Sequence, residues 1–432
     1  MNAIFLTNGH LLDPANHVDQ KTDLFLQNGK IAAIGESAKK MALSNNAAAT
    51  EINLSGRLVM PGIADLCVSL REPGYKQKGT FASELSAAVK GGITAICSHP
   101  LSKPVNDTEA ITRLIRNKCD EFGKSRVLPV AAATKGAEGL QLSEYQGLKG
   151  AGCVAVCHNR RTQISTQVLR RSMQYACTHD MLVVIEPEDA AFAGDGCIAD
   201  GRISTRLGLV GIPEVSESIA LSRALLLAEE TGVKLHVAQI SSAKSVALIA
   251  QAKALGVKVT CDVAIHHLLL TDADIDDFDS MFHLRPPLRT EKDRAALQAG
   301  IESGTIDAIV SQHLPHDVAA KQAPFAESAS GSSGLELLLP LALKLVSEGR
   351  VSRGAIVRAL TTSPAAIMGR SNYGLVEGSD ADLCIVDQDS AFTVTPAYFV
   401  SQGKNTPYSG HSFTGLVTHT YVSGVQVYPP QS

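Results

Sequence analysis

Short apolar segments alternate with longer segments of helical periodicity between about residue 57 and residue 368. Short runs rich in β-branched and small apolar residues predict buried strands, whereas apolar residues that recur at intervals of three and four predict helices. The predicted strands are Leu58–Leu70, Ile93–His99, Arg126–Ala133, Cys153–Cys157, Met181–Pro187, Lys234–Ile240, Val257–Ala264 and Asp307–Gln312. The helices predicted between them include Phe81–Lys90, Asp107–Phe122, Thr162–His179, Glu214–Thr231, Ala243–Leu255 and Glu291–Ser303.

This alternation favours an α/β fold in which the strands close into one barrel. Strands that alternate with helices fit a (β/α)₈ TIM-type barrel, although the pattern alone leaves a doubly wound sheet open. The active site of such a barrel lies at the C-terminal ends of its strands. We expect the barrel over 57–369 and a small β-sandwich domain built from both chain ends, 1–56 plus 370–432. The strand-and-turn segments at these ends are Ile4–Leu12, Thr22–Leu26, Lys30–Gly35, Ala381–Val386, Phe392–Val394 and Thr418–Val427.

Composition and charge exclude several classes of protein. A chain of 432 residues with 45% apolar and 19% charged residues can bury a large core, and a net charge of −4 without Lys/Arg runs argues against nucleic-acid binding. No secretory leader is evident over Met1–Gly9, and no stretch approaches the roughly 18 apolar residues of a membrane span. We therefore expect a cytoplasmic protein. The nine cysteines lack paired CxxC spacing and are expected to be reduced thiols of the core.

The segment from Pro61 to Gly74 reads P-G-I-A-D-L-C-V-S-L-R-E-P-G. It resembles the signature of dihydroorotases, D-x-H-x-H-L-R-E-P-G, in which two histidines of the first strand bind metal. The resemblance continues in order through 91–94, 206–208, 211–213, 266–271, 286–289, 304–309, 378–383 and 405–407. It implies a barrel with a composite β-sandwich, and the interconversion of carbamoyl aspartate and dihydroorotate at a zinc centre.

The residues that this resemblance assigns to the metal centre are replaced on five strands. The family has two histidines on the first strand, a bridging carboxylate on the fourth, histidines on the fifth and sixth, and an aspartate on the last. The residues of this chain at or beside those positions are Cys67, Ser69, His158, Asn159, Glu186, Gln239 and Gln312. Serine and glutamine are poor zinc ligands, and glutamine cannot accept a proton near neutral pH. We therefore expect neither a bound metal nor any other cofactor.

Parts of the substrate-binding region are retained. Arg71 could still bind a carboxylate as a vestigial anion site, or form a structural ion pair with a neighbour such as Glu72. His313 and His316 match family residues and are further vestigial substrate-binding positions. The adjacent residues His266–His267 would point to opposite faces of an extended strand.

The leading hypothesis is a catalytically inactive dihydroorotase-like protein. Such homologues in the family accompany the catalytic chain of aspartate transcarbamoylase. The resemblance therefore implies this catalytic chain as the partner, and a homodimer of the present chain inside a larger complex. A second hypothesis is a metal-free module that binds a ureido or dicarboxylate metabolite through Arg71 and Arg285. A third is an active zinc amidohydrolase whose displaced metal is held by some of Cys67, His158, Glu186, His313 and His316.

Overall fold

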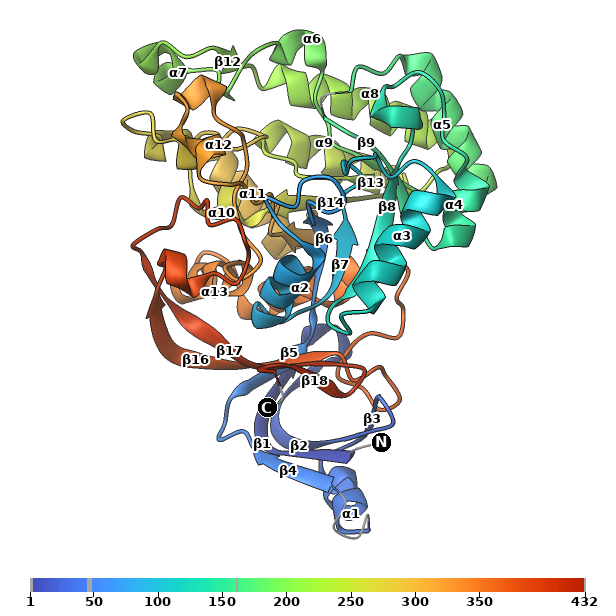
Figure 1. The fold of residues 1–432 in the computed structure, drawn as a ribbon, viewed down its shortest axis with the longest axis vertical. Coiled ribbons are helices and arrows are strands. Elements are labelled where there is room, and N and C mark those ends of the chain that lie inside the picture. The colour runs from blue at the N-terminus through green and yellow to red at the C-terminus, as the bar shows by residue number, and fades with distance from the viewer. Residues whose placement is uncertain (1–2, 45–48, 161, 431–432) are drawn as a thin grey trace.

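The computed structural model describes residues 3–44, 49–160 and 162–430, and within them eight parallel strands form a barrel (Figure 1). The barrel closes between its first and last strands, where Val68 bridges to His313 and the amide of Ser69 donates to the carbonyl of His313 at 2.9 Å. The predicted (β/α)₈ fold is confirmed. In order around the barrel, the strands are β6 (Ile63–Val68), β7 (Ile93–Ser98), β8 (Arg126–Ala132), β9 (Ala155–His158), β10 (Leu182–Ile185), β13 (Leu235–Val237), β14 (Val259–Ala264) and β15 (Ala308–Val310).

Helices surround the barrel, except for α1 (Glu36–Ser44), which packs against β2 (Val18–Gln27) and β3 (Lys30–Ile34) near the N-terminal end of the chain. The predicted helices at 81–90 and 291–303 have the predicted bounds, and the others differ by a few residues at their ends. In the described part of the chain, no helix is both long and apolar enough to cross a membrane. The helices are α1 (Glu36–Ser44), α2 (Phe81–Lys90), α3 (Glu109–Asp120), α4 (Tyr145–Ala151), α5 (Thr166–Thr178), α6 (Ala190–Ala193), α7 (Arg202–Leu207), α8 (Val215–Thr231), α9 (Ala243–Ala254), α10 (Ile265–Leu269), α11 (Glu291–Ser303), α12 (Ala319–Gln322), α13 (Leu338–Ser347), α14 (Arg353–Leu360) and α15 (Thr362–Ile367).

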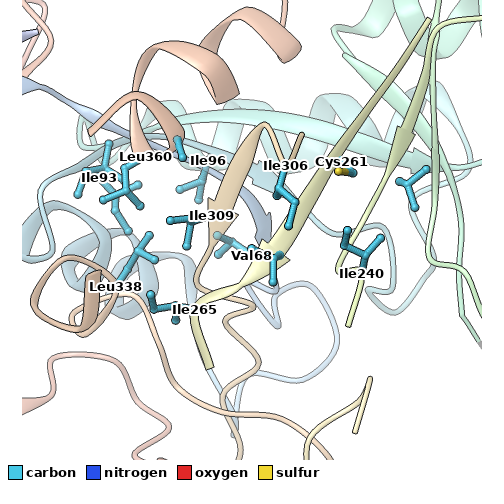
Figure 2. Packing of buried hydrophobic residues seen from close by; sticks show 14 of the residues in the cluster. Val68, Ile93, Ile96, Ile240, Cys261, Ile265, Ile306, Ile309, Leu338 and Leu360 are labelled. Atoms are coloured by element: carbon cyan, nitrogen blue, oxygen red, sulfur yellow. The ribbon is translucent and has the colours of Figure 1, made fainter. Parts of the chain in front are cut away.

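Side chains along each barrel strand alternate between the lumen and the surrounding helices. On β7, Ile96 belongs to the large outer core, in which Ile309 of β15 and Leu338 of α13 also lie (Figure 2). The neighbouring residues on the same strand, Ala95 and Cys97, belong instead to the cluster inside the barrel. Small side chains dominate that inner cluster and leave a cavity in the lumen. They are Ala64, Ala95, Cys97, Ala155 and Cys157.

The two ends of the chain meet in a second sheet, and both termini lie in this part of the molecule (Figure 1). Its order is β18-β17-β16-β5-β1-β2-β3, and β4 also pairs with β1. The predicted pairing of the two ends is confirmed, because β16 from the C-terminal end pairs with β5, which pairs with β1. The strands are β1 (Ala3–Asp13), β2 (Val18–Gln27), β3 (Lys30–Ile34), β4 (Ala49–Asn53), β5 (Leu58–Pro61), β16 (Leu383–Thr393), β17 (Ser412–Val422) and β18 (Val425–Tyr428). A small separate pair is β11 (Ile198–Ala199) with β12 (Gly211–Ile212).

The expected strand Leu58–Leu70 is in fact two strands in different sheets. Its first part is β5 of the second sheet, and its second part is β6 of the barrel. The chain passes between the sheets at Gly62, where a Cβ atom would lie 2.2 Å from the hydroxyl of Thr94, so only glycine fits. Arg126 on β8 donates to buried Asp382 at 3.0 Å and joins the barrel to the second sheet. An unbroken apolar run in the sequence does not reveal such a crossing.

Candidate functional site

The C-terminal ends of β6, β13 and β15 bring three of the expected site residues together at the barrel mouth. The amide nitrogen of Gln312 donates to the side-chain oxygen of Gln239 at 2.6 Å. The amide nitrogen of Gln239 donates in turn to the sulfur of Cys67 at 2.8 Å. Gln312 also donates to the backbone carbonyl of Arg285 at 2.8 Å. Side chains that replace family metal ligands therefore satisfy one another's hydrogen bonds.

Both glutamines have unusual backbone conformations. Gln239 has a φ of +55° and Gln312 a φ of +52°, in the left-handed region that costs non-glycine residues free energy. Each lies two residues beyond the end of a short barrel strand and turns its side chain into the mouth. The strained backbone at these two positions thus directs both side chains into the barrel mouth, although a glutamine side chain carries no charge.

Glu186 follows β10 and faces the same space. Its carboxylate lies 2.9 Å from Nε2 of His99 and accepts a hydrogen bond from the backbone amide of Arg160, also at 2.9 Å. Burial by itself would raise the pKa of this carboxyl, but the charge and hydrogen bond of His99, together with Arg160, lower it to about 2. Glu186 is therefore a carboxylate at neutral pH.

Cys157 completes a cluster that the sequence reasoning missed. One ring nitrogen of His99, the sulfur of Cys157 and a carboxylate oxygen of Glu186 all lie within 4.8 Å of one another. The strand period of two could have identified this set, since Ala155 and Cys157 share the lumen face of β9. His99 likewise lies two residues beyond Cys97 of β7, on the same side of the strand. A small cavity of about 30 Å³ lies beside this cluster in the lumen.

His158 lies on the other face of β9. Its Nε2 is 2.8 Å from the hydroxyl of Ser172 on α5, so the side chain points away from the barrel mouth. Burial lowers the pKa of this imidazole to about 4, which keeps it neutral. Asn159 is buried and its side-chain oxygen is 3.8 Å from the sulfur of Cys157. Ser69 lines a separate small pocket with Arg71.

The expected ion pair between Arg71 and Glu72 is wrong. Arg71 donates to the carbonyl of Pro315 at 2.9 Å and lies 3.0 Å from Nε2 of His316. Glu72 instead pairs with exposed Lys76, because the chain turns at Arg71, whose φ is +63°, and the two side chains diverge. Burial, with the nearby Arg71, lowers the pKa of His316 to about 3.

The remaining expected residues also have structural partners. His313 is fully buried, and its Nε2 lies 2.7 Å from the carboxylate of Glu84 on α2. Arg285 donates to the carboxylate of Glu188 at 2.9 Å. This ion pair engages the guanidinium group that would have to bind a metabolite. The proposed alternative metal set is thus not brought together, because His158, His313 and His316 point elsewhere. The expectation for His266–His267 is also wrong, since these residues lie in helix α10 rather than on an extended strand.

Comparisons with known proteins agree on the family. Residues 56–245 match the family model described as dihydro-orotase-like, and residues 345–428 match the amidohydrolase family. A dihydroorotase-like protein of Pseudomonas putida is 42% identical over 99% of this chain and 100% of its own length. The chain belongs to the dihydroorotase-like amidohydrolases.

Other relatives of this dihydroorotase-like chain carry the names of enzymes. A dihydroorotase of Syntrophus aciditrophicus (strain SB) is 38% identical, over 98% of this chain and 99% of its own length. Among solved structures, the L-hydantoinase (dihydropyrimidinase) of Arthrobacter aurescens superposes with a TM-score of 0.88 at 26% identity, covering 99% of this chain and 96% of that one. The family resemblance drawn from the sequence is therefore confirmed.

The metal centre implied by this family does not fit the residues of this chain. The resemblance assigns metal ligands to positions on the first, sixth and last barrel strands. In this chain, Cys67, Gln239 and Gln312 stand there and are hydrogen-bonded to one another. Amide groups are weak ligands for zinc, which prefers thiolate, imidazole and carboxylate. Arg160 also donates to Gln239 at 3.2 Å and places a positive charge beside these positions.

Proposed function

We propose that this dihydroorotase-like protein is catalytically inactive and that it has a structural role in the assembly of aspartate transcarbamoylase in pyrimidine biosynthesis. The observation that carries the inactivity is the hydrogen-bonded set of Gln312, Gln239 and Cys67, which occupies positions where the family requires metal ligands and a proton-transferring aspartate.

The chemistry explains why this replacement matters. Hydrolysis or closure of a cyclic amide needs an activated water or a polarised carbonyl, and zinc lowers the pKa of bound water from 15.7 to about 7. Gln312 has no basic oxygen that could take up the proton of an attacking water. No catalytic step can therefore be assigned to these side chains.

The retained scaffold supports a role in assembly. The barrel is complete in the described residues, and its core is packed although the family's metal ligands are gone. On helix α8, Ile219 and Leu226 are exposed, and their spacing of seven residues places them on one face. Two exposed apolar side chains on one side of an outer barrel helix are candidate contacts for a partner. The proposed partner is the catalytic chain of aspartate transcarbamoylase, and the proposed complex contains this chain as a homodimer.

Two measurements test the proposal. We expect no turnover of dihydroorotate or carbamoyl aspartate by the purified protein, and coelution with an aspartate transcarbamoylase catalytic chain in a complex much larger than either protein. A stable interface buries on the order of 1,000 Å² or more, so charges introduced at its apolar contacts are costly.

A matched pair of variants locates the interface. The double variant Ile219→Glu/Leu226→Glu should abolish coelution, whereas Leu43→Glu on distant helix α1 should leave it unchanged. Separate elution of the wild-type proteins at micromolar concentration in light-scattering chromatography would contradict the assembly role. Measurable turnover would contradict the inactivity, whatever the outcome for assembly.

A further inference from the structure

Three potential metal donors from different strands lie together on the lumen side of the barrel mouth. His99 follows β7, Cys157 lies on β9, and Glu186 follows β10, and their donor atoms all lie within 4.8 Å of one another. The three side chains line the same cavity. His99 and Glu186 remain partly exposed, which leaves a path from solvent to buried Cys157.

The donor types select the ion. Zinc binds imidazole nitrogen, thiolate sulfur and carboxylate oxygen at about 2.0–2.3 Å, so tetrahedral donors lie about 3.5 Å apart. The longest separation among the three donors would need to shorten by little more than about 1 Å, whereas the His99–Glu186 pair, now at 2.9 Å, would open slightly. A thiolate from Cys157 and the carboxylate of Glu186 would balance the charge of a divalent ion. We infer that His99, Cys157 and Glu186 form a binding site for one zinc ion.

The contacts of the free site are compatible with this role. One carboxylate oxygen of Glu186 bonds His99, and the other accepts from the backbone amide of Arg160. Zinc would replace the first contact by two metal bonds, while the second would remain and orient the carboxylate, as outer hydrogen bonds do in known metal sites. The sulfur of Cys157 has a long contact of 3.8 Å with Asn159, which a metal bond would easily replace.

This site differs from the centre of the family. His99 and Cys157 stand at positions to which the resemblance assigns no ligand, and only Glu186 stands at a family ligand position. Three protein ligands leave one coordination position open. The inference is independent of the proposed inactivity, because zinc binding at these residues supplies neither the aspartate that Gln312 replaces nor the missing ligands at Cys67 and Gln239.

Equilibrium dialysis of the full-length protein against zinc sulfate, followed by elemental analysis, tests the site. We expect one zinc ion per chain in the wild type. Cys157→Ser should weaken binding more than about tenfold, because even outer hydrogen-bond partners of a metal contribute about 10- to 100-fold. The matched control is Cys97→Ser, which removes another thiol of the same cavity outside the cluster and should retain zinc.

Cobalt(II) gives a second readout. In the wild type and in Cys97→Ser, it should produce a thiolate-to-cobalt charge-transfer band, which Cys157→Ser should lack. If Cys157→Ser fails to fold by circular dichroism, Glu186→Gln serves as the second ligand variant and should also lose zinc. A folded wild type that retains no zinc, or a Cys157→Ser variant that retains stoichiometric zinc, overturns the inference. Turnover of dihydroorotate by the zinc-loaded protein would instead contradict the proposed inactivity and leave the zinc site standing.

Discussion

Replacing His313 by leucine removes one side of a buried hydrogen-bonded pair and tests whether this residue is structural. Nε2 of His313 lies 2.7 Å from the carboxylate of Glu84, and both side chains have 0% exposure. Nδ1 of His313 also accepts a hydrogen bond from the amide of Gly334 at 3.1 Å. Leucine nearly preserves the volume but makes neither bond. Glu84 would keep its contacts with Ser401 and Gln402, but would lose the hydrogen bond from His313.

The expected loss follows from the burial of the pair. Removing the hydrogen-bond donor of a buried carboxylate costs about 3–5 kcal/mol, because the remaining charge stays desolvated without a partner. The entropy of unfolding grows with chain length, so each kcal/mol lowers the Tm of a chain of this size by about 1 °C. We therefore expect the Tm of His313→Leu to be about 3–6 °C below that of the wild type at pH 7.

The pH dependence of this effect has a defined sign. Burial acts to raise the pKa of Glu84, but the hydrogen bonds from His313, Ser401 and Ser83 hold it below its usual value. A carboxyl with a lowered folded-state pKa stabilises the fold above its unfolded pKa of about 4.3, and this contribution is lost as the pH falls through the folded value. The difference in Tm between wild type and His313→Leu should therefore shrink below about pH 4.3.

Scanning calorimetry with a control variant measures the effect. His419→Leu replaces a half-buried histidine of β17 and should change the Tm by less than about 1 °C. The variant Glu84→Gln/His313→Leu removes the buried charge as well, so its loss should be smaller than the sum of the two single losses. A His313→Leu protein that melts within about 1 °C of the wild type would refute the structural role of His313.

Two further predictions concern the barrel mouth. Asp65 is buried on β6 and accepts hydrogen bonds from the backbone amides of Cys67 and Ser311. Burial raises its pKa to about 6, so the wild type should lose stability as the pH rises from about 4 to about 6. Asp65→Asn should remove this pH dependence, and identical pH profiles of the Tm would contradict it. Gln312→Asp restores a base but leaves Cys67 and Gln239 in place. We therefore expect this variant to show no opening or closure of the dihydroorotate ring in a spectrophotometric assay, with or without added zinc. Measurable turnover by this variant would show that the family ligands were misassigned.

The amino-acid sequence by itself determined the architecture and the family. The alternation of apolar runs and helical stripes predicted the barrel because each strand must bury both faces, and each helix one face. The segment from Pro61 to Gly74, together with the matching segments that follow it along the chain, identified the family. They also predict which residues stand at the family's metal-ligand positions, since this prediction needs only the order of residues along the chain.

Only the tertiary structure decided what those residues contact. The partners of Gln312 and His313 lie on elements distant in sequence, at Gln239 and Glu84, and no local pattern predicts such pairs. His99, Cys157 and Glu186 come from separate strands, and they converge only because a closed barrel brings alternate residues to one lumen. The direction of His158, toward α5 rather than into the mouth, depended on the register of one short strand, and a shift by one residue would exchange its faces.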